Sequence, residues 1–211
     1  MADVARRELD WKYTEEFLPE RDDITVLRRH AAELGIDVVS PATGAHLAFL
    51  ATATRAENII EIGTGLGVSA LWLMQGAPGA SFTSIDTEAD YQHVAKAALI
   101  EAGIPANRVR LITGSANQVL PRMNESDYDL VLVDADPEDV IENTDHAIRL
   151  ARPGATIVVA HALWRGKVAD PAQRDEPVAA FRSLLGTLAE STTVRAALSP
   201  VGDGLLQLVK Y

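Results

Sequence analysis

The chain has 211 residues, which is enough for one sizeable hydrophobic core and too few for two ordinary domains. Its formal net charge of −11 argues against a surface that binds nucleic acid, because phosphate contacts need clustered Lys and Arg. The absence of cysteine excludes disulfides, thiolate zinc sites and cysteine nucleophiles.

The first part of the chain is predicted to be helical. The spacing of apolar residues and the helix-ending and helix-starting signals predict three helices, at residues 4–18, 22–34 and 41–54. The N-terminal residues have no apolar core of a signal peptide, and no apolar run approaches the length that spans a bilayer. We therefore expect a cytoplasmic protein that does not enter a membrane.

Strands and helices then alternate along the chain. Strands are predicted at residues 58–62, 80–86, 109–113, 128–134, 155–160, 192–198 and 205–210, and helices at 68–75, 88–102, 116–121, 137–150 and 176–190. This alternation indicates right-handed crossovers and a parallel sheet covered on both faces, whereas the short turn 199–204 indicates a final antiparallel hairpin.

The predicted fold is α/β: a Rossmann-like doubly wound sheet of seven strands, mostly parallel with one antiparallel strand, plus N-terminal helices. We expect a single domain over residues 1–211, with a helical extension at 1–55 and the Rossmann-like core at 56–211. Such sheets bind ligands outside the carboxyl ends of their strands. The strand ends, where a site is expected, are residues 61–67, 86, 114–117, 134–136 and 160–164.

The most informative strand end is a glycine-rich turn. The apolar run 58–62 carries one acid, Glu61, and leads into Gly63, Gly65 and Gly67 before a helix begins. Glycine lets the backbone approach a ligand where a Cβ would collide. Asp86 ends the next strand about twenty residues later, the spacing at which a carboxylate can bind ribose hydroxyls. The alternative role of Asp86 is a cap for the helix at 88–102, and one carboxylate can fill both roles.

The spacing of the glycines and the acid Glu61 together predict the kind of ligand. A dinucleotide site has the spacing G-x-G-x-x-G, and pyrophosphate needs a bare helix N-terminus, but this turn is G-x-G-x-G and is preceded by Glu61. S-adenosylmethionine offers an ammonium, a sulfonium and a ribose diol, and no phosphate. That ligand accounts for Glu61 and Asp86 together.

The chain resembles the class I S-adenosylmethionine-dependent O-methyltransferases of the catechol and caffeoyl-CoA O-methyltransferase family, and within it the small actinobacterial branch. The resemblance runs from about residue 38 to the C-terminus. It rests on the segments VVSPATGAHLAFL, IIEIGTGLGVSALWL, TSID, ITGSANQVLP and YDLVLVDAD, and on the LW pair after the fifth strand.

The resemblance implies a role for individual residues. Val39 and the backbone of Ser40 would cover the methionine portion of the cofactor. The amino-acid end would be lined by Glu61, Gly63, Thr64 and Gly65, with Ser69 near the carboxylate. Asp86 would hold the ribose, Thr87 would lie beside the adenine, Ala116 and Asn117 would sit at the adenine edge, and Asp134 would face the methyl-transfer region.

The chain departs from the family in the residues that bind metal. The family's usual divalent metal lowers the pKa of the attacking hydroxyl, and a lysine serves as base. Its ligands are an acid ending strand four, here Asp134, and an Asp-Asn pair at positions here held by Ala160 and His161. The lysine position holds Pro137. We therefore expect no tight divalent metal, although Asp134, Asp136 and His161 could instead bind Zn²⁺ or Mn²⁺.

Without a metal, His161 is the candidate base, since imidazole titrates near neutral pH, and Asp134 could orient it or hold the acceptor. The alternative is that His161 simply lines the pocket. The polar segment 166–176 is predicted to form a loop over the site.

The predicted function is an S-adenosylmethionine-dependent O-methyltransferase that acts on a small-molecule acceptor. Two alternatives stay open: a catalytically inactive S-adenosylmethionine-binding protein with a regulatory or assembly role, and a nucleotide-dependent oxidoreductase. The resemblance also implies a homodimer, with the N-terminal helices near the interface.

Overall fold

The structure is a computed structural model that describes residues 2–211, with side chains described from residue 6 onward. Its α-helices are α1 (Ala2–Glu16), α2 (Asp22–Glu33), α3 (Pro41–Ala53), α4 (Val68–Gly76), α5 (Ala89–Glu101), α6 (Ala116–Val119), α7 (Val140–Leu150) and α8 (Glu176–Ala189). Its strands are β1 (Asn58–Ile62), β2 (Ser81–Asp86), β3 (Val109–Thr113), β4 (Tyr128–Val133), β5 (Ala151–Val159), β6 (Val194–Ser199) and β7 (Leu205–Lys210). Short 3₁₀ helices are η1 (Ala106–Arg108), η2 (Leu120–Arg122), η3 (Pro137–Asp139) and η4 (Lys167–Ala169).

The strands form one sheet in the order β3-β2-β1-β4-β5-β7-β6 within the described residues. Neighbouring strands are parallel except that β7 runs antiparallel to both β5 and β6. The predicted Rossmann-like doubly wound sheet with one reversed strand is therefore confirmed. In the register, Ile62 pairs with Ile85 on one side and with Val133 on the other, so the ends of β1, β2 and β4 lie level.

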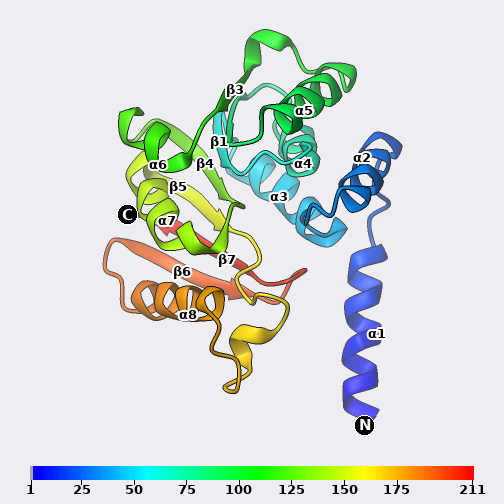
Figure 1. The fold of residues 1–211 in the computed structure, drawn as a ribbon, viewed down its shortest axis with the longest axis vertical. Helices are drawn as coiled ribbons and strands as arrows, with labels where there is room; N and C mark the ends of the chain where they lie inside the picture. The colour runs from blue at the N-terminus through cyan, green and yellow to red at the C-terminus, as the bar shows by residue number, and fades with distance from the viewer. Residues whose placement is uncertain (1) are drawn as a thin grey trace.

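Helices lie on both faces of the sheet (Figure 1). Because alternate strand residues face opposite sides, each face carries its own hydrophobic layer. Ile59 packs on the side of α3, α4 and α5, and Ile60 packs on the side of α7 and α8. Helix α3 lies so close to α4 that a Cβ on Gly44 would stand 2.3 Å from the indole of Trp72. The proposed division at residue 55 between extension and core stays a prediction.

Two predicted boundaries differ from the structure. Strand β5 begins at Ala151, four residues earlier than predicted, since Ala151 pairs with Tyr128 across an irregularity in the register. The helix predicted from residue 137 begins as the 3₁₀ turn η3, which Asp136 caps by accepting a bond from the backbone N–H of Glu138, and becomes α-helical at Val140. None of the described helices has both the length and the apolar character needed to cross a membrane.

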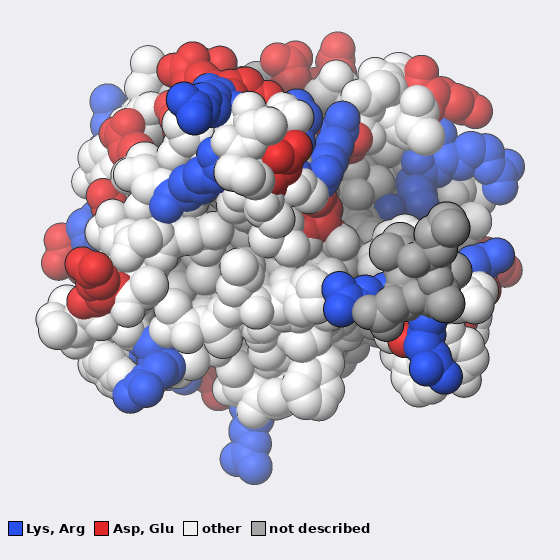
Figure 2. All heavy atoms as spheres, turned by 90° about the horizontal axis from the view of Figure 1, so that it is seen from below, with Lys and Arg blue, Asp and Glu red and all other residues white. Residues whose placement is uncertain are grey.

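Helix α1 projects away from the body of the molecule (Figure 1). Its large apolar side chains are largely exposed, with Leu9 at 68%, Tyr13 at 72% and the adjoining Phe17 at 70%. Figure 2 shows one face of the molecule, where acidic and basic side chains lie around the rim and uncharged ones occupy the centre. The centre of that face therefore carries no basic patch suited to nucleic acid.

Candidate active site

A cavity of about 710 Å³ opens at the carboxyl ends of the parallel strands. It brings together most of the residues that the sequence singled out: Val39, Gly63, Thr64, Gly65, Ser69, Asp86, Thr87, Ala116, Asp134 and His161. Glu61 and Asn117 do not line this cavity. Ten of the predicted site residues therefore line one cavity. Their roles in binding the cofactor or in catalysis stay predictions.

Asp86 braces the glycine turn. Its Oδ2 accepts hydrogen bonds from the backbone N–H groups of Thr64 (2.9 Å) and Gly65 (2.8 Å), and its Oδ1 accepts one from Glu88 N–H (2.9 Å). Helix α5 has Glu88 as its N-cap residue and no side-chain capping bond, so the predicted role of Asp86 as the helix cap is wrong; Asp86 binds the turn that leads into the helix instead. A carboxylate already occupies the turn's N–H donors, so they are not free to bind a phosphate.

The three glycines of the turn serve different purposes. A Cβ on Gly63 would stand 1.9 Å from the carbonyl oxygen of Asp134, and one on Gly67 would stand 2.9 Å from Ala95. These two positions need glycine for packing. Around Gly65 (φ +48°) the nearest atom would be Ile36 Cγ2 at 3.8 Å, an ordinary van der Waals distance, so a Cβ there would meet no clash. Gly65 is the glycine whose missing side chain leaves room in the cavity.

Glu61 lies behind the turn and is fully buried. Its carboxyl oxygens accept hydrogen bonds from Ser69 Oγ (2.6 Å) and Ser84 Oγ (2.7 Å). Burial raises the pKa of Glu61 to about 8, although the two serine hydrogen bonds oppose this rise. Glu61 therefore reaches the cavity only through Ser69, and it is largely protonated near neutral pH.

Asn117 also lies beside the cavity without lining it. Its Nδ2 donates to Asp139 Oδ1 over 3.4 Å, and its buried Oδ1 has no hydrogen-bond partner. Its neighbour Ala116 does reach the cavity. The predicted contact of Asn117 with the adenine edge stays a prediction.

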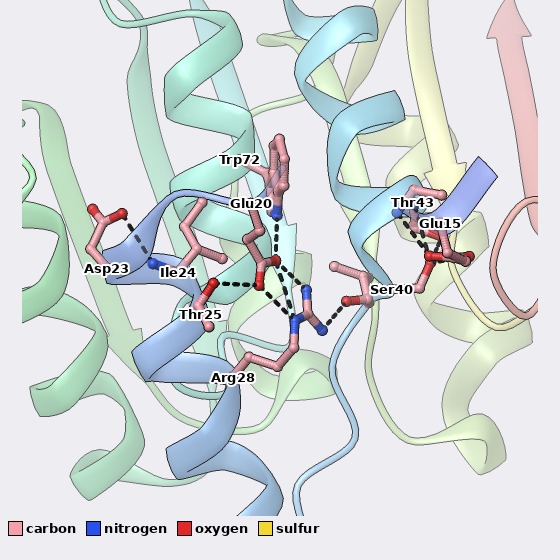
Figure 3. Close-up of polar contacts among 11 residues, drawn as sticks. Glu15, Glu20, Asp23, Ile24, Thr25, Arg28, Ser40, Thr43 and Trp72 are labelled. Atoms are coloured by element: carbon pink, nitrogen blue, oxygen red, sulfur yellow. Dashed lines mark hydrogen bonds and ion pairs between the residues drawn. The ribbon is translucent and has the colours of Figure 1, made fainter. Parts of the chain in front are cut away.

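Helix α2 holds the Val39–Ser40 segment from outside (Figure 3). Arg28 Nη1 donates to the carbonyl oxygen of Val39 over 2.6 Å, and the same guanidinium pairs with Glu20 (Nη2 to Oε1, 2.6 Å). Glu20 Oε1 also accepts from Trp72 Nε1 at 3.3 Å. This half-buried chain of charge-assisted bonds fixes one wall of the cavity.

Helix α1 contributes a second hold on the same wall. Glu15 accepts hydrogen bonds from Ser40 Oγ (2.9 Å) and from the backbone N–H of Ala42 (3.0 Å), at the N-terminus of α3 (Figure 3). The turn between β6 and β7 packs on the other side, where a Cβ on Gly202 would stand 2.3 Å from Thr43 Oγ1. The N-terminal end of α3 therefore contacts the turn that carries Asp203.

His161 lies between two carboxylates. Its Nε2 is 3.3 Å from Asp134 Oδ1 and its Nδ1 is 3.4 Å from Asp203 Oδ2. Burial lowers the pKa of His161, but the hydrogen bond and charge of Asp134 together with Asp203 outweigh burial and raise the pKa to about 9. His161 is therefore an imidazolium near neutral pH, so a role as a free base would first require the loss of a proton.

The backbone after β5 is strained. His161 (φ 56°), Trp164 (φ 45°) and Arg165 (φ 55°) all adopt the left-handed conformation, which costs a residue with a side chain roughly 1–2 kcal/mol. Asp203 holds this segment by accepting from the backbone N–H of Arg165, whose guanidinium pairs with Asp37. Among the described residues, three of the five non-glycine residues with positive φ lie in this segment, which delivers His161 to the cavity.

Sequence reasoning missed several cavity residues, among them Trp11, Asn143, Arg165 and Asp203. Asp203 had a usable signal: because β7 is reversed, the turn that precedes it must lie at the same edge as the carboxyl ends of the parallel strands. Trp11 had no such signal, since the position of a separate helix depends on tertiary contacts.

The segment 166–176 was predicted to cover the site, and this prediction is wrong. No described residue from 166 to 176 lines the cavity. Arg182 of α8 instead binds backbone carbonyl oxygens of the segment, among them those of Val168 (3.0 Å) and Gln173 (2.8 Å). These bonds from Arg182 to backbone carbonyl oxygens tie the segment to α8.

The residues at the family's metal position do not fit a hard divalent cation. Mg²⁺ requires several oxygen ligands in octahedral geometry, but Ala160 offers no side-chain oxygen, and Asp134 is already paired with His161. Asp136 uses one carboxyl oxygen to cap η3. Within the described part of the chain, no group of three or more His, Asp or Glu is arranged to hold a metal.

Comparison with known proteins gives a consistent result along the chain. A family model described as "O-methyltransferase" matches residues 12–211. Among curated relatives, a protein of Mycobacterium sp. (strain JLS) named "Putative O-methyltransferase" is 41% identical and covers 96% of this chain and 92% of its own. A protein of the same name from Mycobacterium avium is 43% identical over 89% of this chain and 85% of its own.

Solved structures agree with this family. A protein from Corynebacterium glutamicum has a TM-score of 0.87 at 30% identity, covering 98% of this chain and 97% of that one. The O-methyltransferase TomG of Streptomyces achromogenes, involved in tomaymycin synthesis and solved in complex with S-adenosylmethionine, has a TM-score of 0.83 at 29% identity over 96% of both chains. An O-methyltransferase of Bacillus cereus, solved with S-adenosylhomocysteine, has a TM-score of 0.84 at 25% identity over 97% of both. The chain belongs to the O-methyltransferase family.

Proposed function

We propose that this enzyme transfers a methyl group from S-adenosylmethionine to a hydroxyl of a small-molecule acceptor, without a tightly bound divalent metal. The observation that carries the cofactor assignment is the Asp86 carboxylate on the N–H groups of Thr64 and Gly65. It occupies the donors that a pyrophosphate would need, which disfavours a dinucleotide. The relatives solved with S-adenosylmethionine and S-adenosylhomocysteine support the same ligand.

The residues present fit that cofactor. The room left at Gly65 and the braced turn offer a cradle for the amino-acid end, beside Val39, Gly63 and Ser69. Asp86 and Thr87 would hold the ribose and the near side of the adenine, with Ala116 beyond them. When bound, S-adenosylmethionine supplies an electrophilic methyl group on a positively charged sulfur. Rigid positioning by the chain supplies much of the rate of an in-line displacement.

The proposal of a metal-independent reaction rests on the residues at the family's metal position, which do not offer the several oxygen ligands that Mg²⁺ requires. The family's metal would bring positive charge to the acceptor oxygen, and in this chain the charged group at the corresponding place is His161 beside Asp134. An imidazolium there would stabilise a developing oxyanion by hydrogen bonding and by charge. His161 thus acts as an electrostatic and hydrogen-bonding group, and Asp134 orients it.

A homodimer is the proposed assembly. The exposed apolar side chains of Leu9 and Tyr13 in α1, with the adjoining Phe17, form a surface that a second copy of the chain could cover. Sedimentation of the chain and of a Leu9→Glu, Phe17→Glu variant would check this, since two charges on α1 should shift a dimer toward the monomer.

The proposed function is tested by calorimetry and by product detection. We expect the protein to bind S-adenosylmethionine and not NAD, and to release S-adenosylhomocysteine with members of a panel of phenols, equally with and without a chelator. Binding of the cofactor without turnover of any phenol would favour the inactive alternative, and turnover that chelator abolishes would overturn the metal-free mechanism.

The role of His161 is tested by its replacement. We expect His161→Ala to leave the affinity for S-adenosylmethionine nearly unchanged and to lower turnover about 10²-fold or more, because an oxyanion-stabilising donor is lost. Unchanged turnover would remove His161 from the mechanism.

A further inference from the structure

A chain of buried polar side chains runs behind the glycine turn and ends at the cavity. It consists of Gln92, Thr64, Ser84, Glu61 and Ser69, which we call the buried relay; each of the five is at most 5% exposed. Consecutive members are joined by hydrogen bonds. Gln92 lies in α5 and Ser69 lies in α4 at the cavity wall. The buried relay therefore connects α5 to the cavity through groups that are shielded from water.

The orientation of the first member, Gln92, is fixed by a backbone carbonyl. Gln92 Nε2 donates to the carbonyl oxygen of Ile112 over 2.9 Å, and Gln92 Oε1 accepts from Thr113 Oγ1 over 2.8 Å. A carbonyl oxygen can only accept, so the amide cannot be turned round without losing this bond. The contact between Gln92 Nε2 and Thr64 Oγ1, at 3.3 Å, is therefore one in which Gln92 donates.

The two hydroxyls of the relay pass this direction on. Thr64 Oγ1 lies 2.7 Å from Ser84 Oγ, and Ser84 Oγ lies 2.7 Å from Glu61 Oε2. Among the described residues, Gln92 and Ser84 are the hydrogen-bond partners of the Thr64 hydroxyl, and Gln92 Nε2 only donates to it. Because a buried hydroxyl proton needs an acceptor, Thr64 donates to Ser84, and Ser84 in turn donates to Glu61 Oε2.

Glu61 then has one place for a proton of its own. Burial raises the pKa of Glu61 to about 8, and the charges that act on it, those of Asp134 and Asp86, are both negative and add to the rise. Near neutral pH the group is therefore a carboxylic acid. Its Oε2 already accepts from Ser84, so the proton lies on Oε1 and is donated to Ser69 Oγ, 2.6 Å away. The hydroxyl proton of Ser69 is then free to point into the cavity.

The cavity side of Ser69 suits a negatively charged group. Ser69 lies in the first turn of α4, where the backbone N–H groups have no partners within the helix and the N-cap residue, Gly67, offers no side chain. The N–H groups of Thr64 and Gly65, by contrast, are occupied by Asp86. A ligand carboxylate beside Ser69 would therefore meet a helix N-terminus and one hydroxyl proton.

In an inference that rests on the proposed function, we propose that Glu61 is a positioning residue for the cofactor: in its protonated form it turns the Ser69 hydroxyl proton toward the carboxylate of the cofactor's amino-acid end. Loss of the Glu61 proton reverses the last bond of the relay, because Ser69 must then donate to Glu61 Oε1. The cofactor carboxylate would face a hydroxyl lone pair with a buried negative charge behind it. Glu61 thus selects an anionic group at this end of the cavity without touching the ligand.

The test compares S-adenosylhomocysteine with its decarboxylated analogue, which keeps the amine and lacks the carboxylate. Calorimetry of the parent protein at pH 7 and pH 9 gives the dissociation constant of each ligand. We expect S-adenosylhomocysteine to bind about tenfold more weakly at pH 9, where roughly nine-tenths of Glu61 is ionised, and the analogue to lose about twofold or less. His161 and the ligand amine titrate with both ligands, so they do not produce this difference. Equal losses for the two ligands, or no loss for either, would overturn the inference.

The conservative variant Glu61→Gln tests the direction of the last bond. Its amide can accept from Ser84 and donate to Ser69, as the protonated Glu61 does, and it does not titrate. We expect its affinity for S-adenosylhomocysteine at pH 7 to lie within about twofold of the parent and to fall by about twofold or less at pH 9. A variant that keeps the tenfold loss, or that binds at pH 7 as weakly as the parent does at pH 9, would contradict the role of Glu61.

Ser69→Ala locates the effect at the end of the relay. It should weaken binding of S-adenosylhomocysteine about tenfold at pH 7 and leave the affinity for the decarboxylated analogue within about twofold of the parent. An unchanged preference for the carboxylate would assign the buried relay to the fold alone. A parent protein that fails to bind S-adenosylhomocysteine at pH 7 would contradict the proposed function itself, whereas tight binding with a flat pH profile contradicts only the role of Glu61.

Discussion

The two halves of the cavity are built in different ways. On the cofactor side, several polar groups satisfy one another: Asp86 binds the glycine turn, Glu61 binds Ser69 and Ser84, and Arg28 binds the carbonyl oxygen of Val39. On the acceptor side, His161 sits between two carboxylates, and the backbone that carries it is strained.

The difference separates a general function from a particular one. The cofactor side holds its shape through bonds that also stabilise the fold, so the same groups serve structure and ligand. The acceptor side depends on charged side chains that pair with one another, His161 with Asp134 and with Asp203. Substrate choice can therefore change on that side while the sheet and the glycine turn stay the same.

The sharpest test within the cofactor side compares two glycines of one turn. Gly63→Ala should destabilise the fold by about 4 kcal/mol or more, because its Cβ would meet the Asp134 backbone at a φ of +97°. Gly65→Ala should cost about 1–2 kcal/mol and should mainly weaken binding of S-adenosylmethionine. Urea unfolding and calorimetry measure both effects. Equal destabilisation by the two variants would contradict the division between a packing glycine and a ligand glycine.

The next test concerns Glu61, the buried acid of the cofactor side. Because the folded pKa of about 8 lies above the ordinary 4.5, stability should fall as pH rises from about 4.5 to 8, where the unfolded chain is ionised and the folded one is not. Glu61→Gln keeps hydrogen-bonding groups beside Ser69 and Ser84 and should abolish this fall, which is worth at most about 5 kcal/mol. The free energies of unfolding of the parent protein and of Glu61→Gln, measured at pH 5 and pH 8, test this prediction. Parallel pH profiles of the two proteins would show that Glu61 ionises normally.

The smallest expected effect is on the acceptor side, at His161. Its raised pKa means that the stabilisation is fully present below about pH 6.5 and is lost as pH rises through about 9. His161→Gln should therefore be less stable than the parent protein at pH 6, by at most about 3 kcal/mol, and nearly equal to it at pH 10. Denaturant titrations across this range measure the difference. An imidazole pKa at or below 6.5 by NMR would contradict the two-carboxylate environment.

Much of the fold follows from local patterns along the chain. Buried strands such as β1 and β4 are continuous apolar runs, helices begin at residues such as Ser40 and Pro41, and the short 199–204 turn requires a reversed strand. Each feature depends on neighbours in the sequence, so a pattern is enough to predict it. The positions of Asp86, Asp134 and His161 at the cavity follow in turn from their places at strand ends.

What the sequence could not decide was which distant groups meet. It did not reveal that Asp86 would occupy the N–H groups of the glycine turn, or that Glu61 would lie behind Ser69, because both depend on the packing of β1 against β2. It also gave no pKa for His161, since that value comes from Asp134 after β4 and Asp203 before β7. The sequence by itself determined the sheet, the glycine turn and the family. Only the tertiary structure decided the charge state and hydrogen bonding of the site, because burial and pairing are properties of contacts between residues far apart in the chain.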